Sequence, residues 1–171
     1  MSTDGKAIVL GIDPGTAILG YGVVAIEGEA LEAVDFGVLT TPASLPLTSR
    51  LLLLFDGLTQ IIDGVHPTDV AVEQLFFSRN VQSAFAVGQA RGVALLAAAR
   101  RGLPVSEYTP QQVKQAVAGY GKATKNQVQT MVQMMLALRE KPQPDDAADA
   151  LAIAICHARW NEAIAGGRVG I

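Results

Sequence analysis

The order of the apolar segments along the chain is the feature that most constrains its fold. Three consecutive runs rich in β-branched residues, at 7–13, 19–26 and 30–39, each have the length and composition of one strand. Gly28 and Glu29 lie between the second and third runs and suit a hairpin turn. We therefore expect the chain to open as an antiparallel meander.

After these strands the pattern alternates between helices and strands. Apolar residues at helical spacing predict one long helix over 47–65 and another over 81–101, which Gly102 ends. Short apolar runs at 69–75 and 104–108 predict the fourth and fifth strands. Three more helices are expected, with N-caps at Thr109, at Thr124 and at Asp145.

This order predicts an α/β fold in which a five-stranded mixed sheet is flanked by helices, as in the ribonuclease H-like fold. The chain of 171 residues has the size of one domain, 1–171, and we expect frayed ends at about 1–6 and 166–171. Half of the residues are apolar, which excludes an intrinsically disordered chain.

No segment is typical of a targeting signal or of a membrane-spanning helix. The longest apolar runs, at 51–55 and 93–99, are far shorter than the roughly 20 residues that a bilayer requires. The single cysteine, Cys156, has apolar neighbours, and we interpret it as a buried core residue of a cytoplasmic protein, in a reducing compartment. With two distant histidines beside it, the chain has no zinc-binding spacing.

The charges are unevenly distributed along the chain. The net charge of −3 and the pI of about 5.3 are unusual for a nucleic-acid-binding protein. However, residues 27–73 hold eight acids and one base, whereas residues 79–125 hold seven bases and one acid. A chain polarised in this way can present a basic face despite its acidic total. Solvated helix faces are the alternative, which we favour for Arg100 and Arg101 at a helix C-terminus.

Four carboxylates lie in apolar surroundings. They are Asp13 at the end of the first strand, Glu73 within the fourth, and Asp146 and Asp149, three apart on one face of the last helix. Buried acids without partners are costly, and acids that share a site repel one another. Divalent cations resolve both problems, and oxygen ligands suit Mg²⁺ or Mn²⁺. Two ions about 4 Å apart could activate a water and stabilise the leaving oxygen of a phosphodiester.

Each acid also has a purely structural alternative. Asp13 before a Pro-Gly pair is a common turn residue, and Glu73 could lie on an exposed strand face. The two acids of the last helix could merely complement its dipole. Asp145 is interpreted as the N-cap of that helix, with an accessory metal ligand as the alternative. Only the expected fold, with the first and fourth strands adjacent and parallel, brings Asp13 and Glu73 together.

Five segments, taken in order, resemble the motifs of the RuvC-type Holliday-junction resolvases. They are Gly-Ile-Asp-Pro-Gly-Thr at 11–16 with Gly-Tyr-Gly at 20–22, Glu-Gln-Leu-Phe at 73–76, Gln-Ala-Arg-Gly at 89–92, Gln-Val-Lys at 112–114, and Asp-Ala-Ala-Asp-Ala-Leu-Ala at 146–152. The similarity runs from about residue 8 to residue 157, which is nearly the whole chain.

The resemblance implies a ribonuclease H-like homodimer that resolves four-way junction DNA by paired symmetric nicks, in recombination and DNA repair. It implies that Asp13, Glu73, Asp146 and Asp149 are the catalytic and metal-binding residues, and that a branch-migration helicase is a further partner. It also implies that Phe76 is the aromatic residue that contacts the centre of the junction, with Phe77 as its neighbour. The basic DNA contacts that it implies are Arg79, Lys114, Lys122 and Lys125.

Physical reasoning supports several of these DNA contacts. An exposed aromatic at Phe76 or Phe77 could stack on an unpaired base, although a core role for one of them is equally compatible with the sequence. The three lysines of residues 114–125 flank a turn with two glycines, whose backbone could approach a phosphate. Ordinary solvation is the alternative for Lys122 and Lys125.

The helix over 82–98 is expected to meet its two-fold mate in the dimer. Ala84, Gly88 and Gly92 would allow two helices to approach closely, although packing onto the sheet explains these small residues equally well.

Three other functions are compatible with parts of the pattern. A ribonuclease H-like nuclease acting on RNA or on simple duplexes would share the carboxylates, but the aromatic pair and the basic 114–125 segment favour branched DNA. A sugar-kinase or actin-type ATPase has a similar Asp-Pro-Gly-Thr loop, but it needs two such domains. A noncatalytic junction-binding module is disfavoured, because its four acids would repel phosphates unless metal neutralised them.

Overall fold

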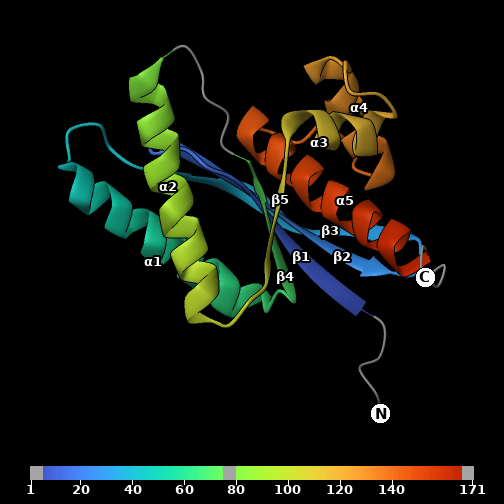
Figure 1. Cartoon of the computed structure of the whole chain (residues 1–171), viewed down its shortest axis with the longest axis horizontal. Coiled ribbons are helices and arrows are strands. Elements are labelled where there is room, and N and C mark those ends of the chain that lie inside the picture. Colours follow the sequence, from blue (N-terminus) through green and yellow to red (C-terminus); the bar gives the residue numbers. More distant parts are fainter. Residues whose placement is uncertain (1–5, 75–79, 167–171) are drawn as a thin grey trace.

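The helices and strands follow one another in the order that the sequence predicts. The computed structural model describes residues 6–74 and 80–166 (Figure 1). Its elements are β1 (Lys6–Asp13), β2 (Ile18–Glu27), β3 (Ala30–Thr40), α1 (Leu47–Val65), β4 (Asp69–Glu73), α2 (Val81–Arg100), β5 (Val105–Tyr108), α3 (Pro110–Ala118), α4 (Lys125–Met135) and α5 (Asp145–Gly166).

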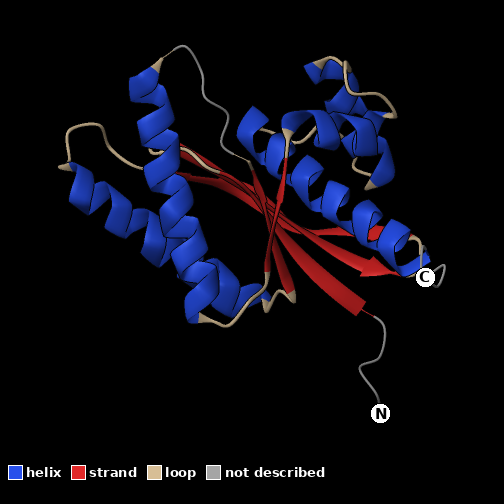
Figure 2. Cartoon of the chain, viewed as in Figure 1, coloured by secondary structure: helices blue, strands red, loops and turns tan. Residues whose placement is uncertain are grey.

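The strands form one mixed sheet in the order β3-β2-β1-β4-β5 (Figure 2). The first three strands are antiparallel neighbours, and β4 and β5 extend the sheet in parallel with β1. Helices α1 and α2 pack together on one face, and α5 crosses the other face with α3 and α4 beside it (Figure 1). The expected antiparallel meander and the ribonuclease H-like α/β architecture are confirmed.

The sheet separates two apolar cores. Alternate residues of β1 point to opposite faces, as the pleat of a strand requires, so Leu10 packs in the core under α1 and α2 while Val9 packs in the core under α5. Burial on both faces explains why β1 is a continuous apolar run rather than an alternating one. Cys156 is fully buried on α5, as expected for a core residue.

Glycines on the sheet let α5 lie unusually close to it. A Cβ atom at Gly11 would lie 2.1 Å from the carbonyl oxygen of Ala150, and one at Gly20 would lie 2.0 Å from that of Asp146. Both separations are far below van der Waals contact, so no side chain fits between the strand and the helix at either position. The first turn of α5 therefore rests directly on β2, opposite the end of β1, because Gly20 pairs with Asp13.

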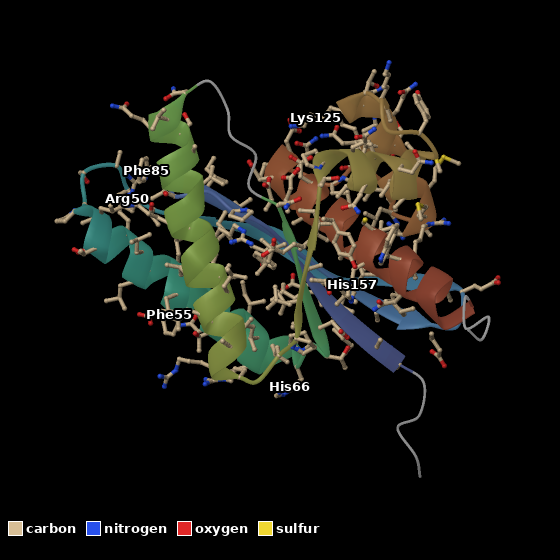
Figure 3. The ribbon with its side chains drawn as sticks, in the orientation of Figure 1. Arg50, Phe55, His66, Phe85, Lys125 and His157 are labelled. Carbon is tan, nitrogen blue, oxygen red and sulfur yellow. The ribbon has the colours of Figure 1, made fainter. Side chains whose placement is uncertain are left out.

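The C-terminal half of α5 is held to the sheet by a buried histidine. The Nδ1 atom of His157 lies 2.7 Å from the hydroxyl of Tyr108 on β5, and its Nε2 atom lies 3.5 Å from a carboxylate oxygen of Asp69 on β4. Figure 3 places His157 between α5 and the strands. Burial lowers the pKa of His157, which favours the neutral ring, and this ring shares a buried hydrogen bond with the Tyr108 hydroxyl through Nδ1.

The predicted helix starts are largely confirmed. Thr109 and Thr124 each form a capping box, in which the threonine hydroxyl accepts from the backbone of Gln112 or Gln127 and that glutamine accepts in return. The fourth strand was expected to extend to Leu75, but β4 ends at Glu73, and Leu75 lies outside the described residues. Among the helices of the described residues, none combines the length and the apolar character needed to cross a membrane.

The close approach at Gly20 predicts that alanine substitution lowers the stability of the protein there but not at Gly64. Gly20→Ala should lower the free energy of unfolding by about 1–3 kcal/mol, because its methyl group overlaps the backbone of Asp146. Gly64→Ala on α1 is the matched control, because a Cβ atom there meets nothing within 4 Å. Chemical denaturation should show Gly64→Ala to be neutral or slightly stabilising. Equal stability of the two variants would contradict the contact.

Candidate active site

The four predicted carboxylates come from three elements that meet at one edge of the sheet. Asp13 ends β1 and Glu73 ends β4, and these two strands are adjacent and parallel, with Ile12 paired to Val72. Asp146 lies in the first turn of α5 and Asp149 follows in the next, where the helix contacts β2. The expected meeting of the first and fourth strands is therefore confirmed.

Three of the four carboxylates are close enough to share one ion. Asp13, Asp146 and Asp149 each offer a carboxylate oxygen, and these three oxygens lie within 4.8 Å of one another. All three side chains are partly buried. Glu73 is not a member of this group, but it lines a pocket together with Asp149. The geometry thus divides the acids into a compact trio and a fourth acid beside it.

The acids oppose one another electrostatically. Burial, followed by the charges of Glu73, Asp149 and Asp146, raises the pKa of Asp13 from 3.8 to about 8. The pKa of Glu73 is raised mainly by burial and then by Asp149, and the pKa of Asp149 is also raised mainly by burial. These carboxylates cannot all be ionised at neutral pH without a compensating cation.

Hard divalent cations fit this donor set. The trio offers only carboxylate oxygens, which are the ligands of Mg²⁺ and Mn²⁺, and the described residues bring no histidine or cysteine into it. A bound ion would also offset the burial and repulsion that raise the pKa of Asp13. The residues present can therefore hold such an ion, with Asp13, Asp146 and Asp149 as the candidate ligands.

Two of the predicted lysines line the same pocket as Glu73 and Asp149. Lys114 lies on α3. Lys125, which Figure 3 labels, is the first residue of α4. The Nζ atom of Lys125 lies 3.6 Å from a carboxylate oxygen of Asp149. Lys122 is exposed in the turn before α4 and does not line this pocket. Phe76, Phe77 and Arg79 lie outside the described residues.

The expectation that Asp145 caps α5 with its side chain is wrong. The helix begins at Asp145, and the carbonyl of Pro144 accepts the backbone N–H of Ala147 at 2.9 Å. The carboxylate of Asp145 instead accepts from Gln129 on α4 at 3.1 Å and lies 3.3 Å from the Nζ atom of Lys125. Asp145 therefore joins α4 to α5 beside the trio.

This link between α4 and α5 is the part of the site that sequence reasoning missed. Lys125 and Gln129 are four residues apart on α4, so they share one face of the helix, and that spacing was the available signal. The pocket is also lined by the apolar side chains of Val113, Val128 and Ile153. None of these three valine and isoleucine residues differs in sequence pattern from an ordinary core residue.

Comparisons with known proteins agree with this arrangement. The chain matches the model of the family described as crossover junction endodeoxyribonuclease RuvC over residues 9–157. The RuvC of Desulforamulus reducens is 56% identical over 162 residues, which cover 95% of this chain and 99% of the relative. The RuvC of Chloroflexus aggregans is 62% identical over 149 residues, covering 87% of this chain and 91% of the relative.

Solved structures give the same result. The structure described as T. thermophilus RuvC in complex with Holliday junction substrate has a TM-score of 0.87 and 41% identity, and the match covers 91% of this chain and 94% of that chain. The yeast mitochondrial Holliday junction resolvase Ydc2 has a TM-score of 0.68 at 16% identity, over 94% of this chain and 82% of that chain, which supports the fold alone. By its family match and by its identity to these relatives, the chain belongs to the RuvC family of crossover junction endodeoxyribonucleases.

Proposed function

We propose that this chain is a metal-dependent endonuclease that resolves Holliday junctions by paired symmetric nicks, in recombination and DNA repair. The observation that carries the proposal is the trio of carboxylate oxygens, within 4.8 Å of one another, at an edge of the sheet that two lysines flank. Membership of the RuvC family and the similarity to a RuvC whose structure contains a Holliday junction support this substrate.

In this proposal Asp13, Asp146 and Asp149 hold divalent ions, with Glu73 completing the set of metal-binding and catalytic acids. Two Mg²⁺ ions, or two Mn²⁺ ions, would supply an activated water and neutralise charge on the leaving oxygen. The three ligands lie on two elements, β1 and α5. Their spacing is set at Gly20 of β2, which pairs with Asp13 and lies directly against the backbone of Asp146. This preorganised placement keeps the acids in position without a rearrangement when substrate arrives.

The lysines give the site its affinity for the DNA backbone. Lys114 and Lys125 line the pocket beside the acids, so a phosphate that approaches the trio passes their ammonium groups. Burial lowers the pKa of Lys125, but the carboxylates of Asp149 and Asp145 outweigh this effect, and the net pKa is raised, so the group stays charged. We also propose DNA contacts for Lys122 and, outside the described residues, for Arg79, Phe76 and Phe77.

Paired nicks require two active sites, and we propose that α2 forms the two-fold contact of a homodimer. Phe85 and Val81 on the N-terminal half of α2 are 68% and 65% exposed, although both are large and apolar. Ala84 and Gly88 lie on the same part of α2 and are small enough for a second helix to approach. A branch-migration helicase and a cytoplasmic location complete the proposal, and the buried, unpaired Cys156 is consistent with the latter.

The proposal predicts a defined substrate and metal dependence. The protein should nick a synthetic four-way junction at symmetric positions with Mg²⁺ or Mn²⁺, and it should be inactive with chelator. Duplex DNA and an RNA–DNA hybrid, assayed under the same conditions, should be cut far more slowly. Faster cleavage of the hybrid than of the junction would favour a ribonuclease function instead.

Asp13→Asn and Asp146→Asn should separate cleavage from binding. Each variant should reduce junction cleavage by about 100-fold or more, because a charge that stabilises the reaction is lost. Junction affinity in chelator should be preserved. The melting temperature of metal-free Asp13→Asn should not fall, because a neutral amide replaces a carboxyl group whose ionisation is opposed by burial and by the neighbouring acids. Cleavage at the wild-type rate in either variant would contradict the assignment.

The raised pKa of Asp13 predicts how metal affinity depends on pH. Below a pH of about 8 the metal-free carboxyl is protonated, and it must lose this proton to bind an ion. Mn²⁺ affinity should therefore rise by roughly tenfold per pH unit up to about pH 8 and then level off. Glu73→Gln removes one of the charges that raise this pKa, so the plateau should begin at lower pH.

Mn²⁺ titrations of the wild type, of Glu73→Gln and of Asp56→Asn would test this dependence. Asp56 is an exposed acid on α1, so its substitution controls for a general loss of negative charge and should leave the profile unchanged. A flat profile in the wild type would show that Asp13 is already ionised and is not the limiting ligand.

Replacing both Lys114 and Lys125 by glutamine should weaken junction binding and flatten its salt dependence. Each lost phosphate contact should reduce the slope of log affinity against log salt by about 0.9. Lys6→Gln is the control, because Lys6 lies at the opposite end of β1 from Asp13 and pairs only loosely with Glu32, at 3.9 Å. An unchanged slope in the double variant would remove these lysines from the DNA-binding face.

A further inference from the structure

A chain of hydrogen bonds, buried or partly buried, joins the loop after Asp13 to both helices of the other layer. Thr16 and Thr41 are 8% and 7% exposed, so both side chains are buried. Nothing in the proposed reaction uses either threonine. Their hydroxyl groups connect the loop after β1, the residue after β3, and helices α1 and α2.

The direction of every bond in this chain is fixed by chemistry. The Nε atom of Arg50 on α1 can only donate, so the hydroxyl oxygen of Thr41 accepts from it at 2.8 Å. The proton of that hydroxyl is then donated to the carbonyl of Thr16 at 2.7 Å. The hydroxyl of Thr16 in turn donates to the carbonyl of Ala86 on α2 at 2.9 Å. No group in the series can reverse its role without losing a partner.

The loop that these hydrogen bonds hold is short and directly follows Asp13. Residues 14–17 connect β1 to β2, and the backbone N–H of Thr41 donates to the carbonyl of Ala17 at 3.1 Å. At Gly15 a Cβ atom would lie 2.2 Å from the carbonyl oxygen of Ile18, so the turn is already as tight as the backbone allows. The loop is therefore bonded twice to Thr41, the residue directly after β3, and once to α2.

The bond to α2 joins the loop to an element outside the sheet. β3 lies next to β2 in the sheet, so its bonds to the loop extend an existing strand pairing. Helix α2 belongs to the opposite layer from α5, and Thr16 reaches it in the turn that also carries the exposed Phe85. Figure 3 labels Arg50 and Phe85 at the same end of the α1–α2 layer.

We propose that Thr16 is a positioning residue, which fixes the carboxylate of Asp13 in the trio by tying its loop to α2 through the Ala86 carbonyl. The inference rests on the proposed function, because it assigns Asp13 as a metal ligand. Asp146 and Asp149 are placed by α5. Asp13 is the last residue of β1, where its backbone pairs with Gly20, and its carboxylate lies at the junction with the following loop, so its position also depends on what holds that loop. Arg50 and Thr41 stabilise the arrangement from α1 and β3.

The test is Mn²⁺ binding by the DNA-free protein, measured by the electron paramagnetic resonance of the free ion. Thr16→Val keeps the shape of the side chain and removes the hydroxyl, and it should weaken Mn²⁺ affinity by about threefold to tenfold, below the effect of a direct ligand partner. Thr16→Ser keeps the hydroxyl and should restore most of the affinity. Junction binding in chelator should be the same in both variants.

Thr130→Val is the matched control. The hydroxyl of Thr130 also donates to a backbone carbonyl, that of Asn126 at 2.8 Å, but on the exposed surface of α4. Its loss should leave Mn²⁺ affinity unchanged. Equal losses in Thr16→Val and Thr130→Val, or in Thr16→Val and Thr16→Ser, would overturn the proposal, as would wild-type affinity in a folded Thr16→Val.

Arg50→Met decides the matter if Thr16→Val fails to fold. It leaves both threonines in place, frees the Thr41 hydroxyl to turn away from Thr16, and should cause a smaller loss of Mn²⁺ affinity in the same direction. Unchanged affinity in Arg50→Met would then overturn the proposal. A wild-type protein that binds Mn²⁺ but cuts no junction would contradict the proposed function instead, so the two failures are distinguishable.

Discussion

Helix α5 lies directly on β1 and β2, and the rest of the structure depends on this contact. Only glycine at positions 11 and 20 leaves room for the helix backbone, which comes within about 2 Å of where a Cβ atom would stand. The same contact places the first turn of α5 opposite the end of β1 and thereby assembles the trio. His157 fixes the other half of the helix to β4 and β5, so α5 cannot slide without breaking a buried bond.

The site itself is an unstable arrangement of charge that the fold enforces. Burial and mutual repulsion raise the pKa values of Asp13, Glu73 and Asp149. Lys125 opposes this rise at Asp149 and Lys114 opposes it at Glu73, but the net pKa of each acid stays raised. The lysines offset only part of the repulsion, which leaves a strong preference for a small, doubly charged cation. They also lie where a phosphate would enter, so the lysines that offset part of the repulsion between the acids are suited to bind DNA.

Much of the fold could be predicted from local patterns. Periodicity located the helices and strands to within a few residues, and Thr109 and Thr124 marked two helix starts, because capping is a contact between near neighbours. The four acids stood out because each interrupted an apolar segment. The role of Asp145 could not be predicted, since its partners Lys125 and Gln129 lie on another helix. Nor could the separation of Glu73 from the trio, which is a matter of side-chain placement.

The trio draws its oxygens from both a strand and a helix, and this has a thermodynamic consequence. An ion held by Asp13 and by Asp146 and Asp149 would cross-link the sheet to α5, so it would bind the folded chain and not the unfolded one. The energy of ion binding is then also energy that resists the detachment of α5. Protection of the α5 backbone against hydrogen exchange would increase with the ion concentration. The active site would then also stabilise the attachment of α5 to the sheet, reversibly and in proportion to ion binding.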